Sequence, residues 1–475
     1  MTSNTDSSEK IFNSDRNHRQ LLQLGASAEE NIYRDIDEIC FEDNYFAPGG
    51  WGQLAQGNKI MEESLLQMSR QYSPWQSYQK LFQQYMFDVD QITTLGEFLL
   101  YEAKMFNRNS VVIVIGDKRY FHPKTEIQLL VDFFKQRNAN FSFIYIIDLL
   151  NQVDHGEIKP EEHLFYCYYN DSEIKAICEQ ENLQFPEIWS KIQASGTQNI
   201  LGREDLNLSD RSWVAQTNID HEHSIFKRSI RSQDLVCTDN QIYYQDQSID
   251  LSKMVLKMEA SFGGHGVYLP HQLSVKLVEQ IISENHNFVL EYFARQPVTY
   301  QPLSIFSPRT NKENSFYHPK FLTELLVDTR ITFLVTSDRQ FKLLNYFFRA
   351  SYSGTPTNLA CGGIFLCSWI VPDRDFLTVF EKVNRFWSQV NTSEYNQFVD
   401  LIKSGLESQG VVNPKSEKPY NFGLIPYLIS ESSTNRLIEY AKSWTKTMTH
   451  LYEQKGRYHK PFFITLDFSL NPYLI

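Results

Sequence analysis

The chain has 475 residues and a formal net charge of −12, and 42% of its residues are hydrophobic and 14% aromatic. This length exceeds one ordinary core and predicts two or three packed units, while the composition excludes a mainly disordered chain. The acidic balance argues against nucleic acid as the main partner, because non-specific phosphate contacts need an excess of Lys and Arg.

The cysteine pattern and the apolar runs point to a cytoplasmic protein without a membrane partner. The six cysteines form no CxxC pair and match no zinc spacing, so we expect most of them to be small buried side chains in a reducing compartment. The N-terminal MTSNTDSSEK lacks the basic and apolar parts of a signal sequence. No apolar run is long enough to span a bilayer.

The first two segments in chain order are a polar tail and a helical region. Residues 1–18 are rich in Ser, Asn and Asp, and we expect them to be disordered. Residues 19–109 show apolar residues at helical spacing, interrupted at the Pro/Gly loop FAPGGWGQ. This region is therefore expected to be a helical N-terminal segment.

Residues 110–208 have the alternating texture of a parallel α/β domain. SVVIVIGD and FSFIYIIDLL are predicted to be buried strands, with KTEIQLLVDFFKQRN as the helix between them and HLFYCYYN as a third strand. A strand, a helix and a strand in this order make a parallel unit with a right-handed crossover. SEIKAICEQENL and EIWSKIQASG are expected to be the helices that complete the layer.

Residues 209–475 are richer in short strands. MVLKM, a glycine-rich loop, the helix SVKLVEQIISE and the strand NFVLEYF follow one another, and RITFLVTSDRQFKLLNYFFRASY predicts two strands around a turn at Ser337 and Asp338. Three helices are expected at DFLTVFEKVNRFWSQV, SEYNQFVDLIKSGLE and STNRLIEYAKSWTKTMTHLYEQKG. The final strand is FFITLDFSL.

The stretch VLKMEASFGGHGVYLP raises the first functional question. Lys257 ends an apolar strand and is followed by a loop of small residues, Ser261, Gly263, Gly264, His265 and Gly266. The loop could be an ordinary hairpin beside a solvent-facing lysine, or bare backbone N–H groups that hold phosphate together with Lys257. It is neither a Walker loop nor a dinucleotide-binding turn, because no Gly-Lys-Ser/Thr follows and it joins two strands. His265 could be simply exposed or could touch a phosphate.

Three further stretches carry charged or amide side chains at strand ends. Each has a simple structural alternative: a solvated carboxylate, a surface Asp–Arg pair worth little, or a salt-bridged aspartate. Each could also serve a ligand, as a nucleoside contact, an anion clamp or a set of oxygen ligands for Mg²⁺. The residues are Glu291 within Leu290–Phe293, Arg330 beside Asp328, Arg349, Asn358 before Gly362 and Gly363, and Asp467 with Asn471.

Taken in order, these stretches resemble the ATP-grasp ligases. The resemblance runs from about Ser110 to the end of the chain and is strongest at VLKMEASFGGHGV and from Asp328 to Gly363. The preceding α/β layer resembles the pre-ATP-grasp domain of glutathione synthetases and of pheganomycin-type peptide ligases. The implied fold is mixed α/β and α+β: the helical segment, a parallel pre-ATP-grasp domain over 110–208, and an ATP-grasp domain over 209–475 with two antiparallel-sheet subdomains enclosing a nucleotide cleft.

The resemblance also implies a role for each residue. Lys257 would contact the α- and β-phosphates of ATP, and the loop from Ser261 through Gly263, Gly264 and His265 to Gly266 would close over the triphosphate. Leu290, Glu291 and Phe293 would form the adenine and ribose contacts. Arg330, Arg349 and Asn358 would serve the transferred phosphoryl group and the acceptor. Asp467 and Asn471 would bind Mg²⁺, although the chain departs from the family by lacking a terminal E-x-N pair.

The implied activity is an ATP-dependent carboxylate–amine ligase, with ATP and Mg²⁺ as cofactors and an amide or peptide bond as product, in specialised metabolism for example. The expected partners are small carboxylates and amines of amino-acid type, with a homodimer left open. Two alternatives remain: a nucleotide-binding or regulatory relative without catalysis, and a scaffold in which all these motifs are structural.

Overall fold

The fold is taken from a computed structural model of the whole chain. The structure describes twelve stretches of the chain, and it places the side chains of most residues within them. The stretches are residues 39–44, 51–87, 89–116, 126–168, 230–238, 240–258, 266–292, 298–302, 322–351, 363–411, 420–454 and 462–469.

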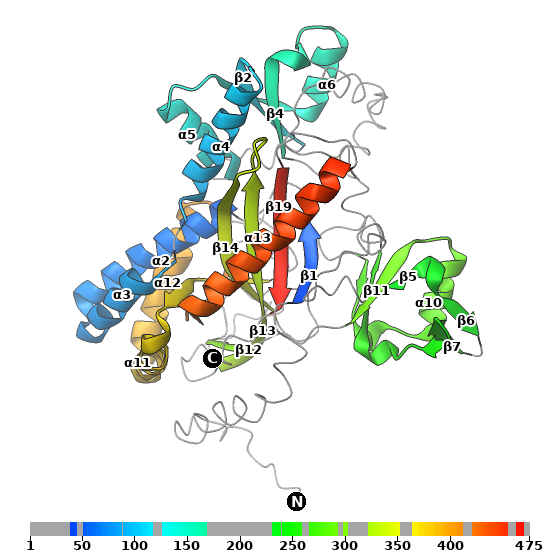
Figure 1. The fold of residues 1–475 in the computed structure, drawn as a ribbon. Helices are drawn as coiled ribbons and strands as arrows, with labels where there is room; N and C mark the ends of the chain where they lie inside the picture. Colours follow the sequence, from blue (N-terminus) through cyan, green and yellow to red (C-terminus); the bar gives the residue numbers. More distant parts are fainter. Residues whose placement is uncertain are drawn as a thin grey trace, which may run out of the picture.

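A seven-stranded sheet forms the centre of the molecule (Figure 1). Its strands run in the order β1-β19-β13-β14-β15-β17, with β12 added to β13, and every pairing is antiparallel except that of β15 with β17. The bounds are β1 Ile39–Asn44, β12 Val298–Pro302, β13 Leu322–Val335, β14 Phe341–Ser351, β15 Ile364–Leu366, β17 Asn421–Phe422 and β19 Phe462–Ser469.

The hairpin of β13 and β14 is the longest pairing in this sheet. The turn predicted at Ser337 and Asp338 is confirmed, because the strands end at Val335 and resume at Phe341. The Thr336 hydroxyl donates to the Asp338 carboxylate, and the Gln340 backbone N–H donates to the same hydroxyl at 2.8 Å. These bonds satisfy polar groups that the reversal of the chain would otherwise leave unpaired.

One face of the hairpin is apolar and is covered by helix α13, Glu431–Gln454. Side chains alternate between the two faces of a strand, so Ile331 and Phe333 of β13 lie on the same face as Tyr346 and Phe348 of β14. These residues are buried with Trp444 of α13, and Figure 1 shows α13 crossing the sheet over β13 and β19. The opposite face of the hairpin carries polar side chains.

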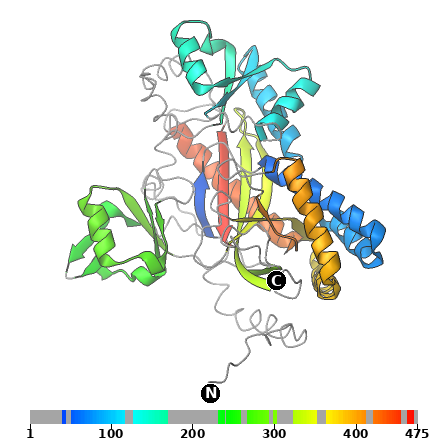
Figure 2. The same cartoon turned by 180° about the vertical axis from the view of Figure 1, so that it is seen from behind.

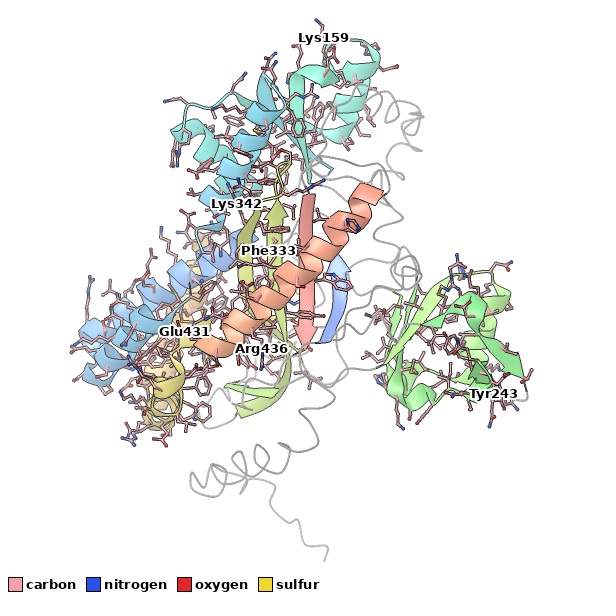
Figure 3. The ribbon with its side chains drawn as sticks, viewed as in Figure 1. Lys159, Tyr243, Phe333, Lys342, Glu431 and Arg436 are labelled. Atoms are coloured by element: carbon pink, nitrogen blue, oxygen red, sulfur yellow. The ribbon has the colours of Figure 1, made fainter. Side chains whose placement is uncertain are left out.

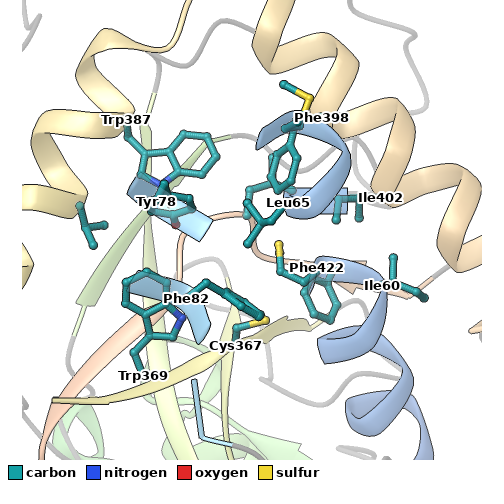
Figure 4. Packing of buried hydrophobic residues seen from close by; sticks show 14 of the residues in the cluster. Ile60, Leu65, Tyr78, Phe82, Cys367, Trp369, Trp387, Phe398, Ile402 and Phe422 are labelled. Atoms are coloured by element: carbon teal, nitrogen blue, oxygen red, sulfur yellow. Dashed lines mark hydrogen bonds between the residues drawn. The ribbon is translucent and has the colours of Figure 1, made fainter. Parts of the chain in front are cut away.

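A second core is built from aromatic side chains of four helices beside the sheet (Figure 4). Trp75 packs edge-on against Phe386 with ring centroids 5.0 Å apart, and Tyr78 stacks on Phe386 at 4.1 Å. The Trp387 indole donates to the Tyr78 hydroxyl at 3.0 Å, so burial leaves this N–H satisfied. The helices are α2 Trp51–Gln71, α3 Ser73–Tyr85, α11 Phe376–Gln389 and α12 Thr392–Ser408, next to the parallel pair β16 Ser368–Val371 and β18 Tyr427–Ser430.

The predicted parallel α/β layer is present, with one correction. Its sheet has the order β3-β2-β4 and parallel pairings, and β2 is buried along its whole length. FSFIYIIDLL is not one buried strand: it divides at Tyr145 into a partly exposed edge strand and a helix, because Ile146, Leu149 and Leu150 have helical spacing. The elements are α4 Gln91–Met105, β2 Ser110–Ile115, α5 Glu126–Gln136, β3 Phe141–Tyr145, α6 Ile146–Asp154 and β4 His163–Tyr168.

A buried carboxyl joins this layer to the tip of the central hairpin. Glu102 of α4 is fully buried, and its Oε1 accepts the Ser337 backbone N–H at 3.0 Å. Burial raises the pKa of Glu102, Asp338 raises it further, and the Ser337 N–H and Lys342 act in the opposite direction. Figure 3 labels Lys342 where the hairpin meets α4.

A separate small body contains a four-stranded antiparallel sheet of order β10-β9-β11-β5. Helix α10, Val275–Ser283, covers one face by packing Val278 and Ile281 against Leu256 and Leu290. A three-stranded sheet, β6-β7-β8, completes the body, and Figure 3 labels its Tyr243. The strands are β5 Ile230–Arg231, β6 Val236–Thr238, β7 Gln241–Tyr244, β8 Gln247–Ser248, β9 Met254–Met258, β10 Val267–Tyr268 and β11 Phe288–Tyr292.

The sequence-based expectations agree with most of these elements. The helices expected at 375–390, 393–407 and 433–456 are α11, α12 and α13, and the final strand is β19. The expectation of helix throughout residues 19–109 is wrong at β1, because residues 39–44 form an edge strand paired with β19. The tail 1–18 and the helices expected at 172–183 and 187–196 lie outside the described residues. No helix in the described parts of the chain is both long and apolar enough for a bilayer crossing.

Glu102 predicts a specific dependence of stability on pH. Its pKa in the folded protein lies above the ordinary value of a glutamate, so the folded state binds a proton more tightly than the unfolded state. The contribution of protonated Glu102 to the free energy of unfolding is therefore fully present below the ordinary pKa of a glutamate. It is lost as the pH rises through the raised pKa of Glu102. Glu102→Gln should reduce the loss of unfolding free energy between pH 4.5 and pH 7.5, measured by urea denaturation.

Glu97 of the same helix supplies the control for this experiment. Its side chain is 51% exposed and pairs with Arg137, so Glu97→Gln should leave the pH dependence close to that of the wild type. An identical pH profile for Glu102→Gln and wild type would contradict the assignment.

Candidate functional site

The polar face of the central hairpin is formed by alternate residues of β13 and β14. The register places Asp328 opposite Arg349, Arg330 opposite Phe347, and Thr332 opposite Asn345. Because paired residues share a face, Asp328, Arg330, Thr332, Asn345 and Arg349 form a polar strip on the side away from α13, which also holds the buried Phe347. Figure 2 shows this side of the sheet.

Asp328 and Arg349 form a buried two-point ion pair. Arg349 Nε donates to Asp328 Oδ1 at 2.8 Å, and Nη2 donates to Oδ2 at 2.6 Å. Their side chains are 0% and 4% exposed. The alternative of a surface pair worth little is therefore wrong, and this pair is held by a planar fork-to-carboxylate geometry in a region without solvent.

Arg330 lies on the same strip, two residues after Asp328 on β13, and is half-buried. The register sets it opposite Asp467 of β19, and Asp467 is itself opposite Glu42 of β1. At this level of the sheet, the adjacent strands β1, β19 and β13 therefore carry Glu42, Asp467 and Arg330 in register. Sequence reasoning did not find Glu42, because the short stretch ICFEDN was included in a region read as helical.

Asn345 is a further polar residue that sequence reasoning missed. It is fully buried, and among the described residues neither its amide nitrogen nor its oxygen has a hydrogen-bond partner. A buried amide without partners costs free energy, so such a group needs an explanation. The sequence does hold a signal, since LLNYFF places one amide inside an otherwise apolar strand.

The small body carries the second set of predicted residues. Lys257 of β9 and Glu291 of β11 form an ion pair, with side chains only 9% and 1% exposed. Lys257 is opposite Val289 in the register, which places Glu291 diagonally across the two strands on the same face. Since α10 packs on the alternate residues Leu256 and Leu290, the pair lies on the face away from the helix. Neither side chain is the solvated group that the simpler alternatives assumed.

The hairpin predicted around the glycine-rich loop is confirmed at its two strands. Val267 of β10 is opposite Lys257 of β9, and the Met258 backbone N–H donates to the Gly266 carbonyl at 2.8 Å. Gly266 has φ of 70°, a left-handed conformation that glycine adopts without a steric penalty. The following predicted site residues lie outside the described residues: Ser261, Gly263, Gly264, His265, Phe293, Asn358 and Asn471.

The structure therefore groups the described site residues into two sets. Arg330 and Arg349 belong to the central sheet, with Asp467 in register, whereas Lys257, Leu290 and Glu291 belong to the small body. Figures 1 and 2 both show the small body beyond the β1 edge of the central sheet, with α10 on its outer side. A ligand that used both sets would lie between two sheets, with cations contributed from each.

The described side chains do not form a metal-binding cluster. Where side chains are described, no three His, Cys, Asp or Glu residues come together as metal ligands. The backbone position of Asp467 is known through its strand register, and Asn471 is outside the described residues. The proposed Mg²⁺ ligands therefore stay a prediction.

Comparisons with known proteins gave no match for this chain among family models, curated proteins or solved structures.

The buried ion pair of the hairpin predicts a large effect of a single substitution. Asp328→Ala leaves the Arg349 guanidinium buried without its counter-ion and should lower the free energy of unfolding by about 3 to 5 kcal/mol. The double variant Asp328→Leu/Arg349→Met removes both charges and should recover most of that loss. Denaturant titration followed by tryptophan fluorescence measures both changes.

The exposed pair of Arg137 and Glu97, with side chains 53% and 51% exposed, is the matched control. Glu97→Ala should cost less than about 1 kcal/mol. An equally small cost for Asp328→Ala would mean that water reaches the Asp328–Arg349 pair.

Proposed function

We propose that this chain is an ATP-dependent ligase that couples a small carboxylate to an amine. The observation that carries the proposal is the polar strip of the hairpin, where Arg330 and Arg349 share one face of adjacent strands and Arg330 is in register with Asp467. Neighbouring guanidinium groups and a carboxylate position at one level of a sheet are suited to a phosphoryl group and its metal ion.

The small body supports the proposal through a second, independent arrangement. Lys257 and Glu291 lie on the sheet face opposite α10, where their side chains are 9% and 1% exposed. A lysine can donate to phosphate oxygens, and a carboxylate can accept from ribose hydroxyls or an adenine amino group. Two sheets that each carry a buried acid–base pair fit the order of motifs that resembles the ATP-grasp ligases.

The proposed reaction has two steps. In the first, a carboxylate oxygen of the substrate attacks the γ-phosphorus of ATP, so that an acyl-phosphate forms and ADP leaves. In the second, the amine nitrogen attacks the acyl carbon, phosphate leaves, and the nitrogen loses a proton. The protein's part is to position the reactants and to neutralise charge on the transferred group, which is the main requirement of phosphoryl transfer. Arg330 and Arg349 are the residues proposed for that role.

Mg²⁺ would supply further charge neutralisation between the phosphates. Oxygen ligands are the type that Mg²⁺ prefers, and Asp467 is the residue proposed to hold it, with Asn471 and its neighbours as further candidates. The cytoplasmic location and the amino-acid-like substrates expected from the sequence belong to the same proposal.

One observation favours the alternative of a nucleotide-binding protein without ligase activity. The Nε–Nη2 edge of the Arg349 guanidinium is engaged by Asp328 in the buried pair. If that pair persists with nucleotide bound, Arg349 serves to position the strand rather than to contact phosphate. Together with the missing E-x-N pair, this makes ATP binding and ATP turnover two separate questions.

Binding is tested first, by calorimetry with ATP and Mg²⁺. Lys257→Ala should weaken ATP binding by about tenfold or more, because a buried ammonium is lost from the proposed phosphate contact. The double variant Lys257→Met/Glu291→Leu removes both buried charges and should fold as the wild type does while failing to bind ATP. Lys253→Ala is the control, since Lys253 is 70% exposed in the same body. Wild-type affinity in both Lys257 variants would exclude the nucleotide-binding proposals.

Turnover is tested by ADP release over pools of amino acids and small carboxylates, with and without Mg²⁺. The ligase proposal predicts release that depends on both the substrate pool and Mg²⁺, and a loss of about 100-fold in Arg330→Ala. Arg374→Ala, a change at an 87% exposed side chain, should leave release unchanged. ATP binding without any release in the wild type would instead favour the non-catalytic alternative.

A further inference from the structure

The ion pair of Lys257 and Glu291 has a consequence for which phosphates the small body can bind. Lys257 is the lysine proposed for the phosphates, yet its ammonium contacts a carboxylate that is 1% exposed. At the position of an approaching phosphate, the positive and negative charges largely cancel. An anion that interacts with Lys257 also approaches Glu291, and in a poorly solvated setting repulsion by a carboxylate is strong.

We propose that Glu291 makes phosphate binding at Lys257 conditional on a nucleoside, so that the site rejects inorganic polyphosphates and accepts ATP. This inference rests on the proposed function. A nucleoside offers ribose hydroxyls and an amino group as donors to Glu291. When these donors bind the carboxylate, Glu291 neutralises less of the Lys257 charge, and that charge acts on the phosphates.

The geometry of the two strands supports this coupling. Glu291 is diagonal to Lys257 across β9 and β11 and the two side chains are in contact, so one ligand group cannot alter Glu291 without altering the surroundings of Lys257. The ammonium has three donors and the carboxylate has two acceptor oxygens, so both can exchange part of their mutual contact for ligand contacts. The flanking Val255 and Val289 are buried, at 7% and 0% exposure, which limits the water available to screen the pair.

Neither Lys257 alone nor Glu291 alone could select ATP over inorganic polyphosphates. An unpaired lysine at a site this buried would bind any phosphate-rich anion, and an unpaired glutamate would repel all of them. Discrimination between ligands arises because a ligand gains the favourable contact with Lys257 only if it also provides hydrogen-bond donors for Glu291. Glu291 is therefore a specificity-determining residue rather than only a nucleoside contact.

The first test needs no substitution. Inorganic pyrophosphate with Mg²⁺ is titrated into the wild-type protein by calorimetry, in the absence and in the presence of saturating adenosine. Adenosine should tighten pyrophosphate binding by about tenfold, and pyrophosphate should tighten adenosine binding by the same factor, because coupling is reciprocal. Independent binding of the two fragments, in a protein that binds ATP, would overturn the inference and leave the proposed function intact.

The second test removes the carboxylate. In Glu291→Gln, pyrophosphate alone should bind about tenfold tighter than to the wild type, and the effect of adenosine should disappear. Asp250→Asn is the matched control: Asp250 pairs with Lys253 in the same body, but its side chain is 53% exposed, so coupling should match the wild type. Unchanged coupling in Glu291→Gln would overturn the inference.

Two further outcomes separate the inference from the proposed function. If the wild type binds pyrophosphate as tightly as ATP, the proposed selectivity is wrong although a phosphate site exists. If the wild type binds neither ATP nor adenosine, the proposed function fails and this inference fails with it. Should Glu291→Gln not fold, the coupling measured in the wild type decides the question alone.

Discussion

Three of the four hydrophobic cores in the described parts of the chain meet on the hairpin of β13 and β14. Leu344 belongs to the core of the parallel layer, Tyr346 to the core under α13, and Phe347 to the aromatic core beside α2. One strand thus contributes to three cores within four residues. Tyr346 and Phe347 lie on opposite faces by alternation, whereas Leu344, two residues before Tyr346, is separated from it by a break in the pairing register. The one irregularity, between Thr332 and Phe333, falls next to Asn345.

This constraint has a functional consequence. A strand that is buried on both faces has no need for ionised side chains, yet Asp328 and Arg349 are retained at 0% and 3% exposure, with Arg330 nearby. Buried ion pairs contribute little net stability compared with apolar residues of the same size. Under the proposed function, these residues serve a ligand as well as the fold. The Lys257–Glu291 pair repeats this arrangement on a second sheet.

Much of the fold follows from the sequence because its signals are local. Helices α11, α12 and α13, strand β2 and the turn at Ser337 and Asp338 are each specified by spacing or turn residues within one window. Strand β1 could not be found in this way, since it is held by pairing with β19, which is distant in the sequence. The prediction of FSFIYIIDLL as one strand was wrong for a related reason: a continuous apolar run fits a strand and a buried helix equally well.

The candidate site was predictable in its residue types but not in its pairings. The strip of Arg330 and Arg349 follows from strand alternation, whereas the burial of Asp328 and the contact of Lys257 with Glu291 depend on register between separate strands. Glu42 could be placed only from the strand register, whereas Asn345 is marked in the sequence as the one amide within the apolar LLNYFF. A co-structure with Mg²⁺ and a non-hydrolysable ATP analogue would show whether one nucleotide contacts both sheets. Phosphate oxygens should lie within hydrogen-bonding distance of both Lys257 Nζ and the Arg330 guanidinium. A nucleotide that contacts only one of the two sheets, or neither, would contradict this prediction.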